Sequence, residues 1–245
     1  MIEILMTATR RPEIVNRTLM SFKKNLFSHI PAKVIINIDP VGPGTDNEVI
    51  EVVKQYFELK FVCLSNVSNF SQAFKRVWQA AESRFCFWLE DDWELIRPVS
   101  LPEMIDLLDS NAYLASLRLP WVKTEENYMK NWKYKFPYVE MGLSGAFMCP
   151  QELKREVGFC GHPSLLNGLF VRRCANLIDI NLNPEKQFHH GNDKLIQEVD
   201  DWNYGVFARP NDEKAVEDIG RSWMVENGFK KKGNKAWFQE WEKEL

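Results

Sequence analysis

The sequence lacks the features of several large classes of protein. Its five cysteines are odd in number and include no Cys-x-x-Cys pair, so neither a disulfide framework nor a zinc site is indicated. No apolar run approaches the ~20 residues that a membrane helix needs. The N-terminal stretch from Met1 to Thr7 carries Glu3 and is too short for a secretory signal. We therefore expect a soluble, cytoplasmic protein without a membrane span.

An excess of positive charge is also missing. The formal net charge is -3, which gives the chain no overall attraction to nucleic acid or to anionic lipid. Internal repeats, low-complexity linkers and a clear domain boundary are absent from the sequence. The 245 residues are 45% hydrophobic and 27% charged, a globular balance that predicts a single domain over residues 1–245. Nine tryptophans could fill its core or line a sugar-stacking cleft.

The stretch around which the sequence is organised is an apolar segment that ends in three acids. Residues Phe85 to Leu89 show no alternation, which is typical of a strand buried on both faces. Glu90, Asp91 and Asp92 follow at its carboxyl end, where open α/β sheets build ligand sites. Adjacent carboxylates repel one another, and a hard ion such as Mg2+ or Mn2+ would compensate them. The alternative is a solvated acidic turn after a core strand.

Strand and helix patterns alternate before this segment. Strands are predicted at 2–7, 33–38 and 60–64, and helices at about 13–25, 47–57 and 71–81. Pro12 suits the first turn of the first helix, and Asn69 or Ser71 can cap the third. Units of this length imply right-handed crossovers and a mostly parallel sheet.

The second half of the sequence has weaker patterns. It predicts helices at 101–108 and 152–157, a strand at 113–119, a loop at 158–167, an extended segment at 177–183, a late strand at 202–209, and a solvated terminal helix within 229–245. Residues 120–138 alternate aromatics such as Trp121 with lysines, which could stack on a sugar or form a packed β-hairpin. Gly145 belongs to a small-residue segment where a ligand could approach the backbone, although a bulge needs no ligand.

Charged side chains at the ends of the predicted elements are candidate ligand contacts. Arg10 and Arg11 lie beside a helix N-terminus, which favours anions, or they are simply solvated. Asp39 follows the second strand and could accept from ribose hydroxyls or form a turn. Glu185 lies in the first turn of a helix that Asn183 and Pro184 would open. The two histidines before Asp193 invite a metal site, but a solvated turn is the more common outcome.

This order of elements resembles the GT-A fold of nucleotide-sugar glycosyltransferases, particularly the inverting family 2 type, over about residues 2–225. The resemblance implies a Rossmann-like α/β domain: a mostly parallel central sheet flanked by helices, with a small acceptor-side β element. Residues 1–119 would be the nucleotide-sugar-binding half, and residues 120–245 the acceptor-side half with a C-terminal tail.

The resemblance also implies roles for individual residues. In the family an acid cluster binds Mn2+ or Mg2+ on the diphosphate, a small-residue strand lines the acceptor site, and an acidic base follows. This chain has one acid at the position of the base where the family commonly has a Glu-Asp pair, and it has Asp218 and Arg221 where a late histidine would stand. The implied nucleotide contacts are Thr7, Thr9, Arg10, Arg11, Asp39, Asp91 and Arg221; the metal ligands are Asp92, Glu90 and Asp218; the acceptor contacts are Trp121 and Gly145; and the base is Glu185, with Asp193 as its rival.

The predicted function is therefore metal-dependent transfer of a sugar from a nucleoside diphosphate to the hydroxyl of a glycan or other acceptor, with inversion. A nucleotidyltransferase of similar fold is one alternative, but the loop from Thr7 to Arg11 lacks the glycines that such an enzyme would need. A non-catalytic nucleotide-sugar-binding module is another. Nucleic acid, through hydroxyls of modified bases, is a further acceptor class, against which the acidic net charge counts.

Overall fold

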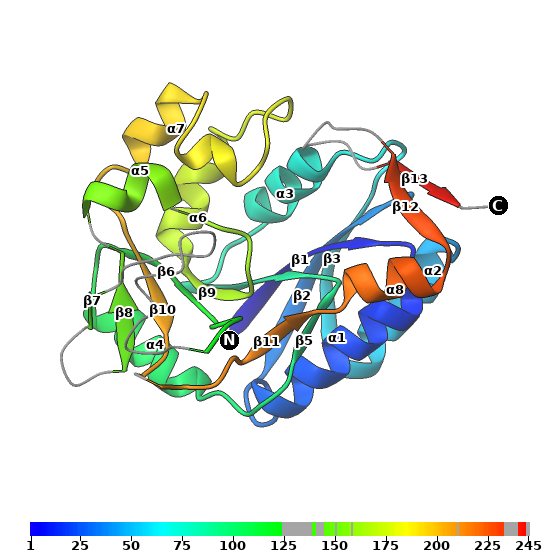
Figure 1. The fold of residues 1–245 in the computed structure, drawn as a ribbon, viewed down its shortest axis with the longest axis horizontal. Helices are drawn as coiled ribbons and strands as arrows, with labels where there is room; N and C mark the ends of the chain where they lie inside the picture. The colour runs from blue at the N-terminus through cyan, green and yellow to red at the C-terminus, as the bar shows by residue number, and fades with distance from the viewer. Residues whose placement is uncertain are drawn as a thin grey trace.

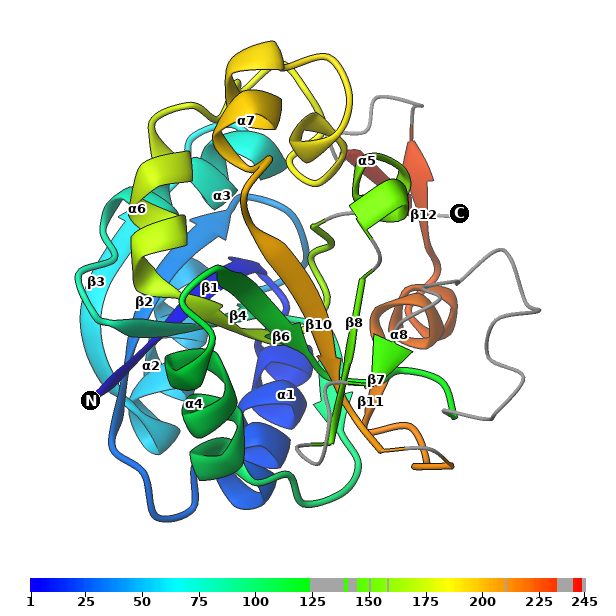
Figure 2. The same ribbon diagram turned by 90° about the vertical axis from the view of Figure 1, so that its left-hand side faces the viewer.

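The main sheet contains strands from both halves of the chain. The computed structural model describes residues 1–123, 139–140, 145–149, 151–157, 159–209, 211–232 and 240–243. Within these ranges the sheet has nine strands (Figures 1 and 2). Strands β8 and β9 run against their neighbours and the others share one direction, so the sheet is mostly parallel, as predicted. Its order is β3 (Glu58–Leu64), β2 (Ala32–Asp39), β1 (Ile2–Thr9), β4 (Phe85–Glu90), β9 (Ser164–Asn167), β6 (Leu114–Arg118), β10 (Asn203–Phe207), β8 (Ala146–Met148) and β7 (Val139–Glu140).

Helices cover both faces of the sheet (Figure 1). One face packs against α1 (Pro12–Asn25), α2 (Asp46–Tyr56) and α4 (Leu101–Ser110). The other packs against α3 (Phe70–Gln79), α6 (Gly168–Ala175) and α7 (Asp193–Glu198). Local sequence fixes where these helices begin: Pro12 occupies the first turn of α1, Thr45 forms a capping box with Glu48, and the Asn69 side chain accepts from Gln72 N at 2.8 Å. None of the described helices is long and apolar enough to cross a membrane.

Aromatic side chains fill the core beneath α3 and α6. Trp78 and Trp88 are fully buried, and Phe74 lies between them with both ring centroids 4.5 Å away. Phe159 and Phe170 complete the cluster. Part of the tryptophan content therefore serves core packing, where each large ring contributes several kcal/mol of burial energy at about 25 cal/mol per Å².

A second, two-stranded sheet carries the chain back to the acidic segment. Strand β5 (Trp93–Leu95) pairs with β11 (Val216–Asp218), and the register places Asp218 opposite Trp93. The short helix α8 (Gly220–Glu226) follows directly. This pairing of segments more than 120 residues apart brings Asp218 and Gly220 beside the acids at the end of β4.

Three expectations for the second half of the chain are wrong. The loop expected at 158–167 contains β9, a buried strand too short for its pattern to be recognised, and α6 follows it. The segment expected to be extended at 177–183 is a series of turns, stabilised where Asn181 N donates to Asp179 Oδ1 at 2.8 Å. In the terminal segment, β12 (Phe229–Lys232) pairs with β13 (Glu240–Lys243), and the expected helix is not observed there. The prediction failed because it used only local periodicity, which carries no information about which strands pair.

Candidate active site

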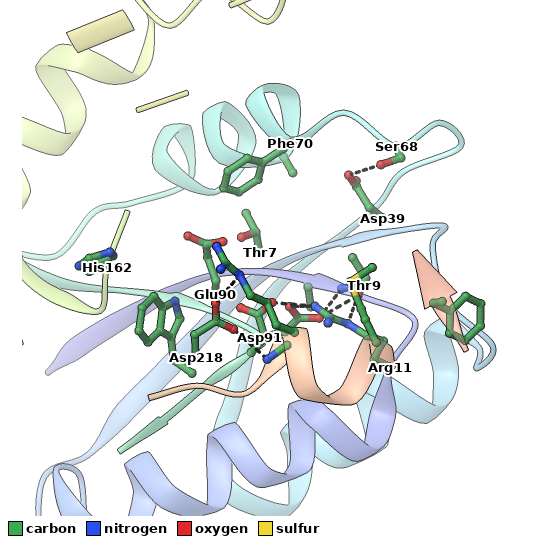
Figure 3. Close-up of a pocket in the computed structure, with 18 of the residues that line it drawn as sticks. Thr7, Thr9, Arg11, Asp39, Ser68, Phe70, Glu90, Asp91, His162 and Asp218 are labelled. Carbon is green, nitrogen blue, oxygen red and sulfur yellow. Dashed lines mark hydrogen bonds and ion pairs between the residues drawn. The ribbon is translucent and has the colours of Figure 1, made fainter. Parts of the chain in front are cut away.

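A cavity of about 770 Å³ opens at the carboxyl ends of β1, β2 and β4 (Figure 3). Strand register creates this edge, because Thr9 pairs with Asp39 and Thr7 with Glu90. Residues from both halves of the chain, 1–119 and 120–245, line the cavity. They are Thr7, Ala8, Thr9, Arg11, Asp39, Ser68, Phe70, Ala73, Glu90, Asp91, Asp92, Trp93, His162, Asn183, Glu185, Asp218, Gly220, Arg221, Met224, Val225 and Phe229.

Asp91 is held by the protein itself. Thr9 donates to its Oδ2 from the backbone nitrogen at 2.8 Å and from the hydroxyl at 2.9 Å. Arg11 donates to Oδ1 at 2.7 Å. Burial lowers the pKa of Arg11, but Asp91 and Asp92 more than offset this and raise it above its usual value. The guanidinium also lies over the Trp223 ring, 5.6 Å from its centroid, so Arg11 organises the acids instead of pointing freely into the cavity.

We expect the Asp91→Asn variant to lose about 2 kcal/mol of free energy of unfolding, because the charge-assisted bond from the buried Arg11 is weakened. Urea denaturation measures this loss. Asp46→Asn is a suitable control, since Asp46 pairs with Arg10 at 2.9 Å in a partly exposed position and should cost less than about 1 kcal/mol. Equal losses in the two variants would contradict this account of Asp91.

Asp92 faces the cavity between other charged groups. Its Oδ2 accepts from Arg11 at 3.2 Å, and the backbone oxygen of Asp92 accepts from Ile219 N at 2.8 Å. The pKa of Asp92 is raised to about 6, first by burial and then by the nearby charges of Asp91 and Asp218, against the opposing effect of Arg11. Gly220 allows this approach, since a Cβ at that position would collide with the Asp92 carboxylate. The three carboxylates Asp91, Asp92 and Asp218 exceed the positive charge of Arg11, and this excess of negative charge suits a cation.

The acids fit a divalent ion that shares its coordination with a ligand. Among the described residues, no three His, Cys, Asp or Glu side chains converge to hold one ion. The trio Asp92, Glu90 and Asp218 is thus not a ready-made metal centre. Mg2+ commonly takes only one or two carboxylates together with phosphate oxygens and water, and Asp92 with Asp218 matches that pattern. Asp91 is already committed to Thr9 and Arg11.

Asp39 lies at one end of the cavity beside Ser68 (Figure 3). It is 5% exposed, and its oxygens accept from Asn37 Nδ2 at 2.9 Å and from Asn69 N at 3.0 Å. Burial raises the pKa of Asp39, against hydrogen bonds that lower it. The N-cap residue of α3, Asn69, is therefore hydrogen-bonded to Asp39. Phe70, the next residue, contributes its ring to the cavity wall.

Glu185 and Glu90 meet over Gly161. The Glu185 Oε1 atom accepts from Gly161 N at 2.5 Å. Glu90 Oε1 and Glu185 Cδ lie 3.0 and 3.3 Å from the position that a Cβ on Gly161 would occupy. Asn183 accepts from Glu185 N at 3.0 Å and so fixes the start of the short 3-10 helix Lys186–Phe188, whereas the sequence predicted a helix that begins at Pro184. Two carboxyl groups from distant segments therefore share one region of the cavity.

Four predicted site residues lie outside the cavity lining. Arg10 pairs with Asp46. Asp193 is exposed in the first turn of α7, where its negative charge interacts favourably with the helix dipole. Because it does not line the cavity, the structure does not support it as a rival base. Gly145 has a φ of 74° and packs beside Arg209. Trp121 is half-buried and contacts His162, with the centroids 5.0 Å apart. The rest of the predicted acceptor elements, 124–138 and 141–144, lies outside the described residues.

Arg221 lies in the first turn of α8 at the cavity wall. Its side chain is 93% exposed and pairs with Asp218 at 3.6 Å. It is the most exposed of the cations that line the cavity in the part of the chain that the structure describes, as Arg11 is 3% exposed. Arg221 can therefore reach an anionic ligand without breaking a buried contact.

Sequence reasoning missed His162 and Gly220, which line the cavity, and Gly161, which donates to Glu185. His162 and Gly161 lie in a predicted loop with no periodicity, and Gly220 becomes significant only through the pairing of β5 with β11. Cys160 directly precedes Gly161 and is therefore next to this site. Burial raises its pKa, but His162 and Arg118 lower it to about 6. Arg118 donates to Cys160 Sγ at 3.1 Å.

Comparisons by sequence found no relatives. No protein-family model matches this chain, and no protein of curated function matches it. Comparison of structures did find similar folds. The S. aureus TarS 1–349 structure in complex with UDP has a TM-score of 0.55 and 11% identity, over 88% of this chain and 59% of that one. The TarS 1–349 complex with UDP-GlcNAc has a TM-score of 0.50 and 14% identity, over 96% and 60%.

A mannosyltransferase from Pyrobaculum calidifontis, PcManGT, was solved in complex with GDP-Man and Mn2+. It has a TM-score of 0.56 and 10% identity, over 91% of this chain and 59% of that one. The chain thus spans about three fifths of the length of each of these structures. At such identities the likeness establishes the fold, which is the mostly parallel GT-A type expected from the sequence.

Proposed function

We propose that the chain is a metal-dependent glycosyltransferase that moves a sugar from a nucleoside diphosphate to an acceptor hydroxyl with inversion. The observation that carries the proposal is the set of acids around one cavity at the carboxyl edge of a GT-A sheet: Asp92 and Asp218 beside each other, and Glu185 further along. The similar structures of TarS and PcManGT contain UDP, UDP-GlcNAc or GDP-Man, which supports the donor class.

Each part of the donor has a matching part of the cavity. The Asp39 and Ser68 end offers polar groups and the Phe70 ring for the nucleoside. Asp92 and Asp218 would hold Mn2+ or Mg2+, and Arg221 would contact the diphosphate. When bound, such an ion would neutralise negative charge on the departing diphosphate. This assignment makes residues 1–119 the main donor-binding half, with Asp218 and Arg221 supplied by the second half.

Glu185 is the group that we assign to proton transfer. An acceptor hydroxyl must lose its proton as it attacks the anomeric carbon, and a positioned carboxylate can take it. Glu185 is fixed by Gly161 N and by Asn183, and it lies in the same cavity as the metal-binding acids. Attack from the face opposite the leaving diphosphate breaks the sugar–phosphate bond as the new glycosidic bond forms, and it inverts the configuration.

A non-catalytic nucleotide-sugar-binding module is the second candidate. It would use the same Asp39, Asp92 and Arg221 contacts but would not require Glu185. The presence of a second carboxylate that is fixed by a backbone N–H and shares the cavity favours the enzyme. Donor binding without any turnover would favour the module.

A thermal-shift panel tests donor binding. The protein is heated with UDP, UDP-GlcNAc, GDP or GDP-Man, each with and without Mn2+. We expect one nucleotide to raise the melting temperature only when Mn2+ is present, with about 2.7 kcal/mol of stabilisation at 100 times its dissociation constant. No shift with any nucleotide, or shifts indifferent to Mn2+, would contradict the proposal.

Gly220→Ala provides a further prediction about the metal-binding acids. The added methyl group collides with the Asp92 carboxylate and must displace it, although alanine is the better helix former at the start of α8. We expect the Mn2+-dependent affinity for the nucleotide to fall about tenfold while the free energy of unfolding changes by less than about 1 kcal/mol. Calorimetric titration measures the affinity. Unchanged affinity would show that Asp92 does not need its present position.

A further inference from the structure

His162 lies at the end of the cavity that the nucleoside contacts do not reach. Figure 3 shows it on one side of Glu90 and Asp218, with Asp39 and Ser68 on the other. A nucleotide sugar has the same linear order of base, diphosphate and sugar. If the diphosphate is near Asp92 and Asp218 and the nucleoside near Asp39, the sugar extends toward His162.

Aromatic rings hold the imidazole in place. The centroids of Trp93 and Trp121 each lie 5.0 Å from that of His162, with interplanar angles of 58° and 61°. Within the described residues, His162 Nδ1 is buried and has no hydrogen-bond partner. A buried polar atom without a partner is unfavourable, and a hydrogen-bonding ligand in the cavity can provide the missing partner.

The residue before His162 in the sequence brings two carboxylates to the same region. Gly161 precedes His162 directly, and it is the residue over which Glu90 and Glu185 meet. A ligand group at His162 therefore also lies close to two hydrogen-bond acceptors. Hydroxyl groups can donate to carboxylates and exchange hydrogen bonds with an imidazole, whereas a purely apolar ligand would leave His162 Nδ1 without a partner.

We propose that His162 binds a hydroxyl group of the donor sugar and so determines which sugar the cavity accepts. This inference rests on the proposed glycosyltransferase function and goes beyond it by assigning the sugar end of the site. His162 would distinguish a nucleotide sugar from its free nucleoside diphosphate, because only the sugar reaches it. The side chains around Asp39 and Asp92 would bind both ligands alike.

The test compares two affinities in matched variants. Calorimetric titrations with Mn2+ use UDP against UDP-GlcNAc and GDP against GDP-Man. His162→Phe keeps a ring between the two tryptophans and removes the nitrogens. His162→Gln keeps a hydrogen-bonding group and serves as a second variant should the phenyl ring disturb folding. His189→Phe is the control, since His189 Nδ1 is also buried without a partner among the described residues but lies away from the cavity lining.

We expect the wild type to bind one sugar nucleotide more tightly than its diphosphate. His162→Phe should lower the affinity for that sugar nucleotide about tenfold and leave the affinity for the diphosphate unchanged. His162→Gln should lose less, and His189→Phe should lose nothing. The inference is overturned if His162→Phe keeps the full preference, or if the wild type shows no preference for the sugar nucleotide.

Failure of the underlying function has a different signature. If neither diphosphate binds the wild type with Mn2+, or if Asp92→Asn binds as well as the wild type, the donor site itself is wrong and the assignment of His162 falls with it. If diphosphate binding depends on Mn2+ and on Asp92 while His162→Phe has no selective effect, only the assignment of His162 is wrong.

Discussion

Replacing Glu185 by glutamine is expected to lower kcat for sugar transfer by about 10²- to 10⁴-fold, because an amide cannot accept the proton of the attacking hydroxyl. The substitution is nearly isosteric, and the amide oxygen can still accept from Gly161 N, which is 2.5 Å from Oε1 in the native protein. The dissociation constant of the donor should therefore remain within about twofold. Steady-state kinetics and calorimetric titration together separate these two quantities.

Asp193→Asn is the matched control for Glu185→Gln. Asp193 was the rival base on sequence grounds, but it is exposed at the start of α7. Its substitution should leave kcat and donor affinity unchanged. A large loss of kcat in Asp193→Asn, or an unchanged kcat in Glu185→Gln, would show that proton transfer has been assigned to the wrong residue.

The Asp92→Asn variant should lose function and gain stability. We expect turnover to fall about 10²- to 10³-fold and donor binding to lose its dependence on Mn2+, since a principal ligand of the ion and its charge are removed. Without metal, the free energy of unfolding of the variant should exceed that of the wild type by on the order of 1 kcal/mol. The carboxylate is charged at neutral pH although burial and then Asp91 and Asp218 raise its pKa to about 6, so its ionised form destabilises the fold.

The size of this stability effect depends on pH. A raised pKa means that the folded protein binds the proton more tightly than the unfolded chain does. The advantage of Asp92→Asn over the wild type is therefore complete above pH 6 and disappears below the ordinary value of 3.8. Urea denaturation at pH 7.5 and pH 4, without metal, measures it. Asp91→Asn, one residue away, should be destabilising at pH 7.5, and a loss of stability in Asp92→Asn at that pH would contradict the assignment of charge repulsion.

The sequence contained enough information for the donor side of the fold. Strands at 2–7, 33–38 and 85–89 could be predicted from apolar runs and turn residues, and in the structure they end at Thr9, Asp39 and Glu90. The rule that parallel strands align their carboxyl ends brings these residues together. The cap at Asn69 and the helix start at Pro12 were likewise local signals, and the structure confirms both.

The orientation of side chains and the distant pairings could not be predicted. Arg11 was expected to contact a nucleotide or to be solvated, yet it donates to Asp91 and Asp92. The three residues become neighbours only when β1 and β4 pair, so the sequence gives no sign of this contact. Asp218 reaches Asp92 through the pairing of β5 with β11. A single histidine in a loop, such as His162, has no periodicity, so only the position of the cavity reveals it.

The most direct test of the account is to measure nucleoside diphosphate release from UDP-GlcNAc and GDP-Man by the wild type in the presence of Mn2+, where water can replace the acceptor. We expect slow release from one donor that stops when EDTA is added and falls at least 100-fold in Glu185→Gln. Tight, Mn2+-dependent binding of a donor with no release, or release that persists in Glu185→Gln, would contradict the claim that this cavity catalyses sugar transfer.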